Sequence, residues 1–391
     1  MTMASSVANE RVIPTLDSLT PGQINAIRRI PPHEAAKPTP ANVTRPTSIF
    51  FSEERYAQEQ ARIFRRLPVP VMLSAALAPG VAIANDAYGI SLILTRTKNG
   101  TARAFLNTCQ HKGSKLLEDE QPHKVPRLVC PFHAWSYGLD GELVGVPRQE
   151  IFSDFCKANY KLAELPCRDA GGFIWVHLDR HSAGDFSTLN GEIVGDLEAL
   201  NLHHMHVYHQ ESFDLKANWK LVLEPFMEPY HVQRLHAKSV APLFADVPSV
   251  VDMLDHHIRI ITGKVQFEPA ILDVPGENIH KTVTHAYIVF PNISIITSPY
   301  YISVMIIVPQ GVDRSRVEYS MLTREAPDNP KAHQLFADSL RIVLDVFGNE
   351  DFRAAVISQA GLAAGGLDKM TYGGLEDVIP KYYEVLEAEL G

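Results

Sequence analysis

The pattern of hydrophobic and polar positions changes from helical to extended early in the chain. Ser52 stands where an N-cap is expected, and the apolar residues that follow it as far as Phe64 share one helical face, which predicts a short helix. From residue 90 the spacing becomes that of strands, interrupted by turn signals such as Asn99-Gly100. The strands predicted in this part are 90–97, 102–106, 135–139, 142–146 and 171–178.

Beyond residue 202, helical and extended patterns alternate. A helical segment near 218–236 comes before five predicted strands, and two helices close the chain. The first closing helix should begin after Pro330, place Phe336 and Phe347 on one face, and end at Gly348. The predicted strands lie near 256–267, 284–290, 293–297, 302–308 and 318–323, and the second closing helix lies at 381–390.

These patterns divide the 391 residues into three parts. Residues 1–46 contain five prolines between positions 31 and 46, which predict a peripheral N-terminal extension with an extended second half. Residues 47–180 form a small β domain, and residues 181–391 form a larger domain that mixes strands and helices. The expected fold class is therefore α+β.

Charge and composition exclude several classes of partner. The net charge is -9, and no run of Lys or Arg is present that would attract nucleic acid or an anionic membrane. Four cysteines are too few for a disulfide scaffold in a chain of this length, which favours a reducing compartment. The N-terminus lacks the pattern of a leader, and the most apolar stretch, residues 300–309, is far shorter than a membrane span. We therefore expect a soluble, cytoplasmic protein.

Two of the cysteines form a constellation with two histidines. Cys109 and His111 are separated by one residue, and Cys130 and His133 follow eighteen residues later as a Cys-x-x-His pair. Two thiolates and two imidazoles can hold a tetrahedral zinc ion or a [2Fe–2S] cluster in which histidines replace cysteines on one iron. The spacing alone does not separate these alternatives. Each pair adjoins a predicted strand, so two loops at one sheet edge are placed to enclose a cluster.

The sequence CPFHAWSY, followed by LDGELVGVP, resembles the second ligand loop and hairpin of the Rieske ferredoxin domain. The resemblance implies that Cys109 and Cys130 bind one iron of a [2Fe–2S] cluster, and that His111 and His133 bind the other. Histidine ligands raise the reduction potential of such a cluster, which suits a cluster that receives and passes on electrons. The gap of eighteen residues is slightly longer than is usual in the family, and a surface loop at 118–124 can absorb it.

A second constellation lies within NWKLVLEPFMEPYHVQRLH. On a regular helix Glu228 and His231 share a face, but five residues turn His236 by roughly 140° away from His231. Both histidines can meet one metal ion only if the helix breaks, and Pro225 and Pro229 favour such a break. Two histidines and one carboxylate, with open positions left, form the facial triad that lets Fe(II) bind O₂.

The segment from residue 218 to residue 236 resembles the mononuclear-iron helix of Rieske oxygenases. The resemblance implies that His231 and His236 bind Fe(II) and that an aspartate far downstream completes the ligand set. Asp351, which precedes a Gln-Ala-Gly-Leu run, is the expected third ligand, and Glu350 is the alternative. A solvated acidic pair at a helix start is the other interpretation, which the resemblance disfavours.

The resemblance also gives Glu228 a role that is not metal binding. In the family, an acid at this position hydrogen-bonds an iron histidine and a cluster histidine of the neighbouring subunit. The resemblance therefore implies that Glu228 joins His231 to His133 of the next subunit and serves as an electron-transfer bridge. A carboxylate that orients an imidazole is suited to this use. This role requires an oligomer, and a head-to-tail homotrimer is expected, possibly with a small β subunit.

The resemblance implies an architecture as well as an activity. The expected fold combines a small all-β Rieske domain with a catalytic domain whose antiparallel sheet is flanked by helices, in the helix-grip, START-like manner. The chain is expected to be a terminal oxygenase that uses O₂ and electrons from a NAD(P)H-linked reductase or a ferredoxin. Its expected reaction is mono- or dihydroxylation of a small aromatic molecule, in an apolar pocket to which Phe226 and Met227 contribute.

Three alternatives remain at this point. The same iron centre can carry out oxidative N- or O-dealkylation, since Glu at position 228 is similar to relatives that demethylate or hydroxylate amines. A Rieske electron-transfer protein would need no second metal. A zinc-stabilised binding protein would need no iron.

Overall fold

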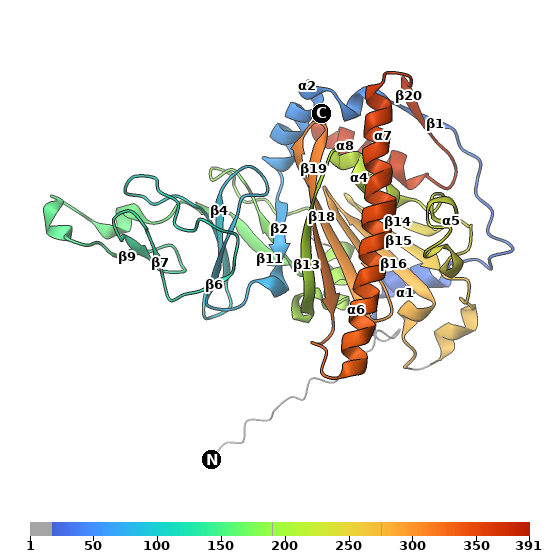
Figure 1. The fold of residues 1–391 in the computed structure, drawn as a ribbon, viewed down its shortest axis with the longest axis horizontal. Coiled ribbons are helices and arrows are strands. Elements are labelled where there is room, and N and C mark those ends of the chain that lie inside the picture. The colour runs from blue at the N-terminus through green and yellow to red at the C-terminus, as the bar shows by residue number, and fades with distance from the viewer. Residues whose placement is uncertain (1–17, 190, 275) are drawn as a thin grey trace, which may run out of the picture.

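The computed structural model describes residues 18–189, 191–274 and 276–391. These residues form a narrow lobe built of strands, which projects from a larger body in which helices cover a sheet (Figure 1). The α+β class expected from the sequence is confirmed.

The narrow lobe contains two small antiparallel sheets, with the strand orders β10-β5-β4-β3-β6 and β7-β8-β9. Both predicted hairpins are present, since β4 pairs with β5 and β8 pairs with β9. The lobe has its own hydrophobic core, which includes Phe105, Trp135 and Tyr137. Its strands are β3 (Val81–Asn85), β4 (Leu92–Arg96), β5 (Ala102–Leu106), β6 (His123–Lys124), β7 (Leu128–Val129), β8 (Ser136–Tyr137), β9 (Leu143–Gly145) and β10 (Glu164–Leu165).

A three-stranded sheet joins the lobe to the body. It has the order β11-β12-β2, and all four residues of its central strand β12 are buried, as expected for the run at 171–178. Its hydrophobic residues belong to the large core of the body, which also includes Leu92, Leu94 and Ala104 of the lobe, and not to the smaller core around Trp135. Its strands are β2 (Val69–Leu73), β11 (Cys167–Ala170) and β12 (Phe173–Val176).

The body is built on a seven-stranded antiparallel sheet with the order β13-β19-β18-β17-β16-β15-β14. The five strands predicted after residue 256 are confirmed, and β13 and β14 are additional edge strands. The bounds are β13 (His206–Leu215), β14 (Val250–Leu254), β15 (His257–Gly263), β16 (Val283–Val289), β17 (Ile293–Thr297), β18 (Tyr301–Gly311) and β19 (Arg314–Thr323).

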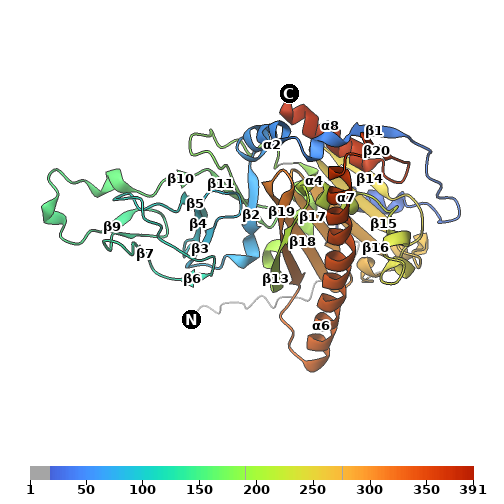
Figure 2. The same ribbon diagram turned by 45° about the horizontal axis from the view of Figure 1, so that its top comes forward.

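A long helical segment crosses one face of this sheet (Figures 1 and 2). It runs from α6 (Pro330–Asp345) through a π-helical segment (Val346–Phe352) into α7 (Arg353–Ala363). The prediction that the helix ends at Gly348 was therefore wrong. Gly348 lies inside the π-helical segment, where its backbone continues the helix with i→i+5 bonding.

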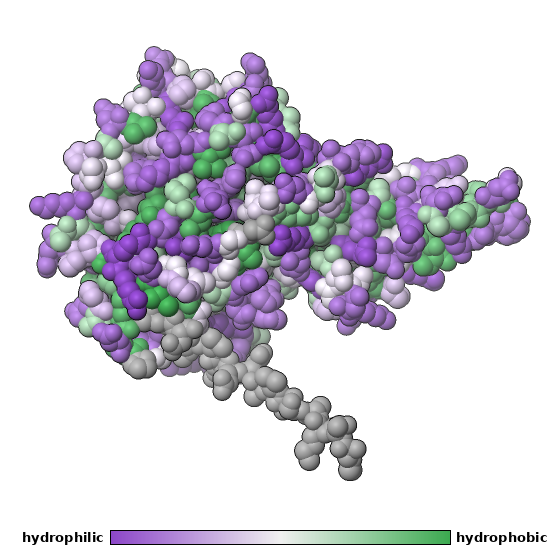
Figure 3. Space-filling model, turned by 180° about the vertical axis from the view of Figure 1, so that it is seen from behind, coloured by the Kyte–Doolittle hydropathy of each residue, from purple (hydrophilic) through white to green (hydrophobic). Residues whose placement is uncertain are grey.

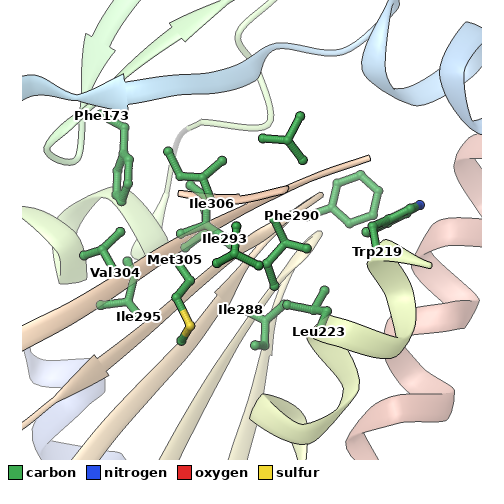
Figure 4. Packing of buried hydrophobic residues seen from close by; sticks show 14 of the residues in the cluster. Phe173, Trp219, Leu223, Ile288, Phe290, Ile293, Ile295, Val304, Met305 and Ile306 are labelled. Carbon is green, nitrogen blue, oxygen red and sulfur yellow. The ribbon is translucent and has the colours of Figure 1, made fainter. Parts of the chain in front are cut away.

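The core of the body lies between the sheet and a short helix from the middle of the chain. Helix α4 (Trp219–Leu223) directs Trp219 and Leu223 toward strand residues such as Ile288 and Phe290 (Figure 4). The chain then continues through a 3-10 turn (Glu224–Met227) into α5 (Val232–Leu235). The last helix, α8 (Val378–Leu390), adds further buried side chains to this core, and α3 (Glu192–Ala199) packs on α1.

The N-terminal extension was expected to be peripheral, and for its described part this was wrong. Helix α1 (Pro21–Arg28) buries Ala26 and Ile27 against Ile261 and Val283 of the large sheet. Strand β1 (Val43–Pro46) pairs with β20 (Lys369–Tyr372), which lies just before the last helix. The capped helix α1 lets this segment cover the sheet despite the prolines of its second half. Residues 1–17 lie outside the described part.

The predicted helix that begins after Ser52 is confirmed as α2 (Glu53–Glu59), and the Ser52 side chain accepts a hydrogen bond from the Arg55 backbone. It packs on the body instead of on the narrow lobe. Its last residue, Glu59, is fully buried and holds the Lys220 ammonium at 2.7 and 2.9 Å. The expected boundary at residue 47 therefore falls before an element that stabilises the larger domain.

The face of the molecule opposite to Figure 1 is mainly hydrophilic, with hydrophobic residues scattered over the body and the projecting lobe (Figure 3). Among the described residues, no helix has both the length and the apolar character needed to cross a membrane.

Candidate metal centres and substrate cavity

The helix that carries the paired histidines is interrupted, as the sequence predicted. After the 3-10 turn, Glu228 adopts extended backbone with φ -144° and ψ 147°, and a new helical turn begins only at Val232. Pro225 lies in the 3-10 turn and Pro229 directly after the extended residue. The break turns His231 and His236 toward one another, with ring centroids 4.9 Å apart.

Asp351 reaches the same place from the π-helical segment. Its Oδ1 atom lies 3.6 Å from Nε2 of His231 and 3.3 Å from Nε2 of His236. Asp351 is only 2% exposed, and this oxygen has no hydrogen-bond partner among the described residues. Within the described part of the chain, His231, His236 and Asp351 form the group that could hold a metal ion. Their potential metal-ligand atoms lie within 4.8 Å of one another.

Two further carboxylates fix the orientation of the two imidazoles. Oε1 of Glu228 lies 2.7 Å from Nδ1 of His231, and Oε2 of Glu350 lies 2.5 Å from Nδ1 of His236. A carboxylate only accepts hydrogen bonds, so each Nδ1 carries the proton and each Nε2 directs a lone pair toward Asp351. The alternative ligand Glu350 thus stands behind His236, on the side away from the triad.

The donor set fits a divalent cation. Two imidazole lone pairs and one buried carboxylate oxygen converge without a hydrogen-bond donor among them, and such a set of acceptors is stabilised by a metal ion. Burial by itself lowers the pKa of His236, but Asp351 and Glu350 outweigh this effect, and the net shift is upward. The site therefore has a strongly negative potential.

The four residues expected to hold a cluster lie at the tip of the narrow lobe. Cys109 and Cys130 are buried, and the rings of His111 and His133 have centroids 4.6 Å apart. Each ligand loop closes on itself, since the Gly113 backbone donates to the Cys109 carbonyl and the Cys130 backbone donates to the Trp135 carbonyl. Trp135 supports the site by stacking on His111 with centroids 4.7 Å apart.

The polar atoms of this site also fit a metal cluster. The Nδ1 atoms of His111 and His133 are buried, and neither has a hydrogen-bond partner in the described part of the chain, so both are available to bind a metal. Burial raises the pKa of the Cys109 thiol, although Tyr137 at 3.4 Å opposes the shift, and a bound metal would stabilise the thiolate. These four residues do not form a group as tight as that around Asp351, which favours a two-iron cluster over one tetrahedral zinc ion.

The two loops that contain the expected cluster ligands lie at the opposite end of the chain from the triad of His231, His236 and Asp351. The loops belong to the far end of the narrow lobe, near β7 and β9, and the triad belongs to α5 and the long helical segment of the body (Figures 1 and 2). Phe132, beside His133, is 61% exposed, and Tyr230, beside His231, is 49% exposed. Each centre therefore adjoins an exposed aromatic residue.

A cavity of about 520 Å³ adjoins the triad, and His231, His236 and Asp351 form part of its wall. The other walls come from the ends of β15 to β18, from the segment after α5, and from α6. Most of the lining side chains are apolar, as expected, and Phe226 is among them. Met227, the other residue expected to contribute to the pocket, is not among the lining residues and belongs to the large hydrophobic core instead. The polar lining includes Ser249, Thr262, Lys264, Gln266, Lys281, Thr284, Ser298 and Ser303.

Sequence reasoning missed a buried acid behind the iron site. Glu224 accepts hydrogen bonds from the hydroxyl groups of Tyr372 (3.0 Å) and Tyr383 (2.7 Å). Burial raises its pKa to about 7, although the two hydroxyl groups oppose the shift. No local pattern marks this acid, because its tyrosine partners are about 150 residues away in the sequence.

Comparison with known protein families gives two matches. Residues 68–158 match the family described as Rieske [2Fe-2S] domain, and residues 202–391 match the family described as Ring hydroxylating alpha subunit (catalytic domain). The first match lies within the β domain expected at 47–180, and the second lies within the domain expected at 181–391.

Curated relatives are oxygenase subunits. The chain is 28% identical over 229 residues to the carnitine monooxygenase oxygenase subunit of Acinetobacter baumannii. The matched region covers 57% of this chain and 59% of that protein. It is 33% identical over 160 residues to the glycine betaine monooxygenase oxygenase subunit of Pseudomonas aeruginosa, which covers 39% of this chain and 35% of that protein. The match thus spans about a third to three fifths of these relatives.

Solved structures share the fold. A quaternary ammonium Rieske monooxygenase in complex with L-carnitine has a TM-score of 0.74 at 20% identity, covering 92% of this chain and 97% of that chain. Naphthalene 1,2-dioxygenase with bound indole has a TM-score of 0.65 at 21% identity, covering 82% of this chain and 80% of that chain.

Proposed function

The chain belongs to the Rieske non-haem iron oxygenases, as an alpha subunit with a [2Fe–2S] cluster and a mononuclear iron, and we propose that it oxidatively removes an alkyl group from a small amine. The observation that carries the proposal is the set of three converging acceptors, His231, His236 and Asp351, in the wall of a mainly apolar cavity. Iron bound there supplies the activation of O₂, which side chains cannot provide.

The reaction balances with a reductant outside this chain. An N-methyl group, O₂, two electrons and two protons give an N-hydroxymethyl group and water. The hydroxymethyl group then leaves as formaldehyde: its O–H proton is released to water or to the amine, the C–N bond breaks, and the electron pair of that bond returns to nitrogen. The two electrons come from a NAD(P)H-linked reductase or a ferredoxin, which is the partner that this function requires.

The residues of the chain prepare the site for this reaction. Glu228 and Glu350 hold the Nδ1 protons of the two histidines, which keeps both Nε2 atoms directed into the cavity. The rings of Phe226 and Phe347 contact one another edge to face, with centroids 5.7 Å apart, and both line the cavity. They exclude water and hold an organic substrate beside the triad.

Two observations favour an alkylated nitrogen over an aromatic ring as the reacting group. The matched relatives are named for carnitine and glycine betaine, both of which carry a quaternary nitrogen. The acidic surroundings of the triad and the aromatic lining of the cavity also suit a cationic group, which is attracted to carboxylates and to ring faces. Hydroxylation of an aromatic ring is the second candidate, since the apolar lining accepts a ring as well.

The electron path of this proposal crosses between subunits. Glu228 contacts His231 within the chain, and His133, the expected cluster ligand, lies between β7 and β8 of the narrow lobe. We expect a head-to-tail homotrimer in which His133 of one subunit reaches Glu228 of the next. The exposed Phe132 and Tyr230, one beside each centre, are suited to become buried in that contact.

Mass spectrometry of the products tests the function. The protein with both metal centres, a surrogate reductase and ¹⁸O₂ would be incubated with N-methylated quaternary and tertiary amines and with small aromatic molecules. We expect loss of one methylene from an amine, with one formaldehyde for each turnover, and no product from Asp351→Asn. Oxygen added to an aromatic ring, without formaldehyde, would replace this function with the second candidate.

A further inference from the structure

One buried lysine in the cavity wall has no carboxylate partner among the residues that the structure describes. Lys264 follows β15, and its backbone is fixed by a bridge to Phe244 and by a hydrogen bond to the Thr282 carbonyl. The residue is only 8% exposed, yet it lines the same cavity as the iron triad. Its ammonium donates one hydrogen bond, of 2.8 Å, to the backbone carbonyl of His280.

Two other lysines show that this environment is unusual. The buried Lys220 has the Glu59 carboxylate at 2.7 Å, and the half-exposed Lys281, also in the cavity wall, has Glu277 at 2.9 Å. Among the described residues, no carboxylate forms a salt bridge with Lys264. Burial lowers the pKa of Lys264 to about 8, and no neighbouring acid opposes that shift. A cation in such a position is stabilised when an anion enters the cavity.

We propose that Lys264 binds a carboxylate group of the substrate. The proposal rests on the proposed function and deepens it, because it defines the substrate class as small zwitterions with a carboxylate at one end and an alkylated nitrogen at the other. Lys264 is thus a specificity-determining residue, and it positions the nitrogen without contact with the iron.

The distribution of charge in the cavity supports this orientation of the substrate. The region around the triad contains Glu228, Glu350 and Asp351, so a bound divalent iron leaves it about one unit negative. Lys264 is the positive group elsewhere in the wall that lacks a carboxylate partner among the described residues. A zwitterion that binds Lys264 through its carboxylate therefore has its cationic group attracted toward the triad.

The hydroxyl groups near Lys264 suit the same ligand. Thr262, which comes shortly before Lys264 along the chain, is paired with Thr284 of the neighbouring strand β16, and both residues line the cavity. Ser249 also lines it and lies 2.7 Å from the Thr262 hydroxyl. A carboxylate has two oxygen atoms with several acceptor positions, so hydroxyl donors can satisfy those that Lys264 leaves open.

Calorimetric binding under anaerobic conditions tests the proposal without turnover. The ligands would be γ-butyrobetaine and its carboxamide, glycine betaine and its carboxamide, and a dimethylamino benzoate with the matching benzamide. In each pair only the charge of one end changes. We expect at least one carboxylate to bind the wild-type protein about 10- to 100-fold more tightly than its amide, as charge-assisted hydrogen bonds imply.

The substitution Lys264→Met removes the charge and keeps the length of the side chain. It should abolish the preference for the carboxylate and leave the affinity for the amide within about twofold, since a neutral ligand makes no ion pair. Lys281→Met is the matched control, because this lysine also lines the cavity but already has Glu277, and the preference should persist. The cluster spectrum and thermal midpoint of each variant show whether it is folded.

Three outcomes would overturn the proposal. These are the absence of any carboxylate preference in the wild-type protein, a preference that persists in folded Lys264→Met, and an equal loss in Lys281→Met. If Lys264→Met does not fold, Lys264→Gln serves in its place, and the wild-type comparison stands by itself.

The outcomes also separate this inference from the proposed function. If the carboxylates bind through Lys264 but no formaldehyde appears in turnover, dealkylation is wrong and the anion site stands. If amines are dealkylated equally well with a carboxylate or an amide end, the function stands and the role of Lys264 is wrong.

Discussion

At the scale of single residues, the expected iron site is defined by hydrogen-bond acceptors that have no hydrogen-bond donors among them. His231, His236 and Asp351 direct lone pairs to one point, and the carboxylates of Glu228 and Glu350 hold the protons on the far side of the two imidazoles. The arrangement is costly in the absence of a cation, because buried acceptors left without donors lose their interaction with water. The arrangement of both imidazoles and the carboxylate is therefore suited to metal binding.

Removal of the Glu350 carboxylate should weaken the binding of iron. In Glu350→Ala, the His236 ring loses its Nδ1 partner and can rotate, so we expect the affinity for Fe(II) to fall about 10- to 100-fold while the [2Fe–2S] spectrum is unchanged. Competition with a chelator measures this affinity. Asp345→Ala, which changes an exposed acid on the same helical segment, is the control, and equal affinities in both variants would refute the role of Glu350.

A second prediction at this scale concerns the buried carboxyl of Glu224. Its pKa is raised from 4.5 to about 7, so between these values the folded protein keeps a proton that the unfolded chain releases. The contribution of Glu224 to the free energy of unfolding therefore decreases as the pH rises through this window, by up to about 3 kcal/mol, and is constant below it. Glu224→Gln keeps an oxygen acceptor for both tyrosines and removes the titration.

The thermal midpoints of wild type and Glu224→Gln, compared in steps from about pH 5 to about pH 8, check this sign. We expect the variant to gain stability relative to the wild type as the pH rises. Glu198→Gln, which changes an exposed acid, is the control variant. A constant difference for Glu224→Gln would show that Glu224 titrates normally.

At the scale of elements, irregular helices place the ligands. The sequence predicted the break between His231 and His236, because a five-residue step and two prolines contradict a regular helix. The π-helical segment that places Asp351 was not predicted, and Gly348 was taken as a helix end. Nothing local distinguishes a glycine that ends a helix from one that lies within it, since the packing of the two flanking helices on the sheet decides the outcome.

The π-helical segment gives a prediction of its own. Deletion of the exposed Asn349 should convert the segment toward a regular helix and rotate Asp351 by about 100° relative to α6. We expect the purified variant to lose mononuclear iron and keep the cluster, as measured by metal analysis and the visible spectrum. Asn349→Ala removes the same side chain without changing the length and should keep both metals. Full iron content in the deletion variant would show that the extra residue does not set the position of Asp351.

The contrast between local sequence signals and packing between distant residues explains which parts of the fold were predictable. Hairpins around Asn99-Gly100 and Asp140-Gly141 follow from local turn chemistry, and their strands were found. The packing of α1 on the large sheet was missed, because it depends on contacts between Ile27 and residues more than 200 positions away. Lys264 was missed for the same reason, since its partners and its cavity exist only in the assembled domain.

At the scale of the whole molecule, the two redox centres occupy opposite ends of an elongated chain. The narrow lobe carries His111 and His133 away from the body that holds the iron triad (Figure 1). Electron transfer within one chain would have to cross that length. Head-to-tail contact between copies brings the lobe of one to the body of the next, which is why the site proposed around Glu228 is complete only in an oligomer.

Mixed oligomers test this arrangement. Cys109→Ala should lack a functional cluster, and Asp351→Ala should lack iron, so each variant alone should be inactive. After unfolding-free subunit exchange or co-expression in equal amounts, half of the subunits have iron, and half of their neighbours supply a cluster. About a quarter of the sites should then be active if electrons cross between subunits, as measured by substrate oxidation per mole of chain. Transfer confined to single chains predicts no activity at all, because no chain in the mixture contains both centres.

The control combines Cys109→Ala and Asp351→Ala in one chain, and this chain is mixed with wild type. If electrons cross between subunits, only sites that join two wild-type chains contribute.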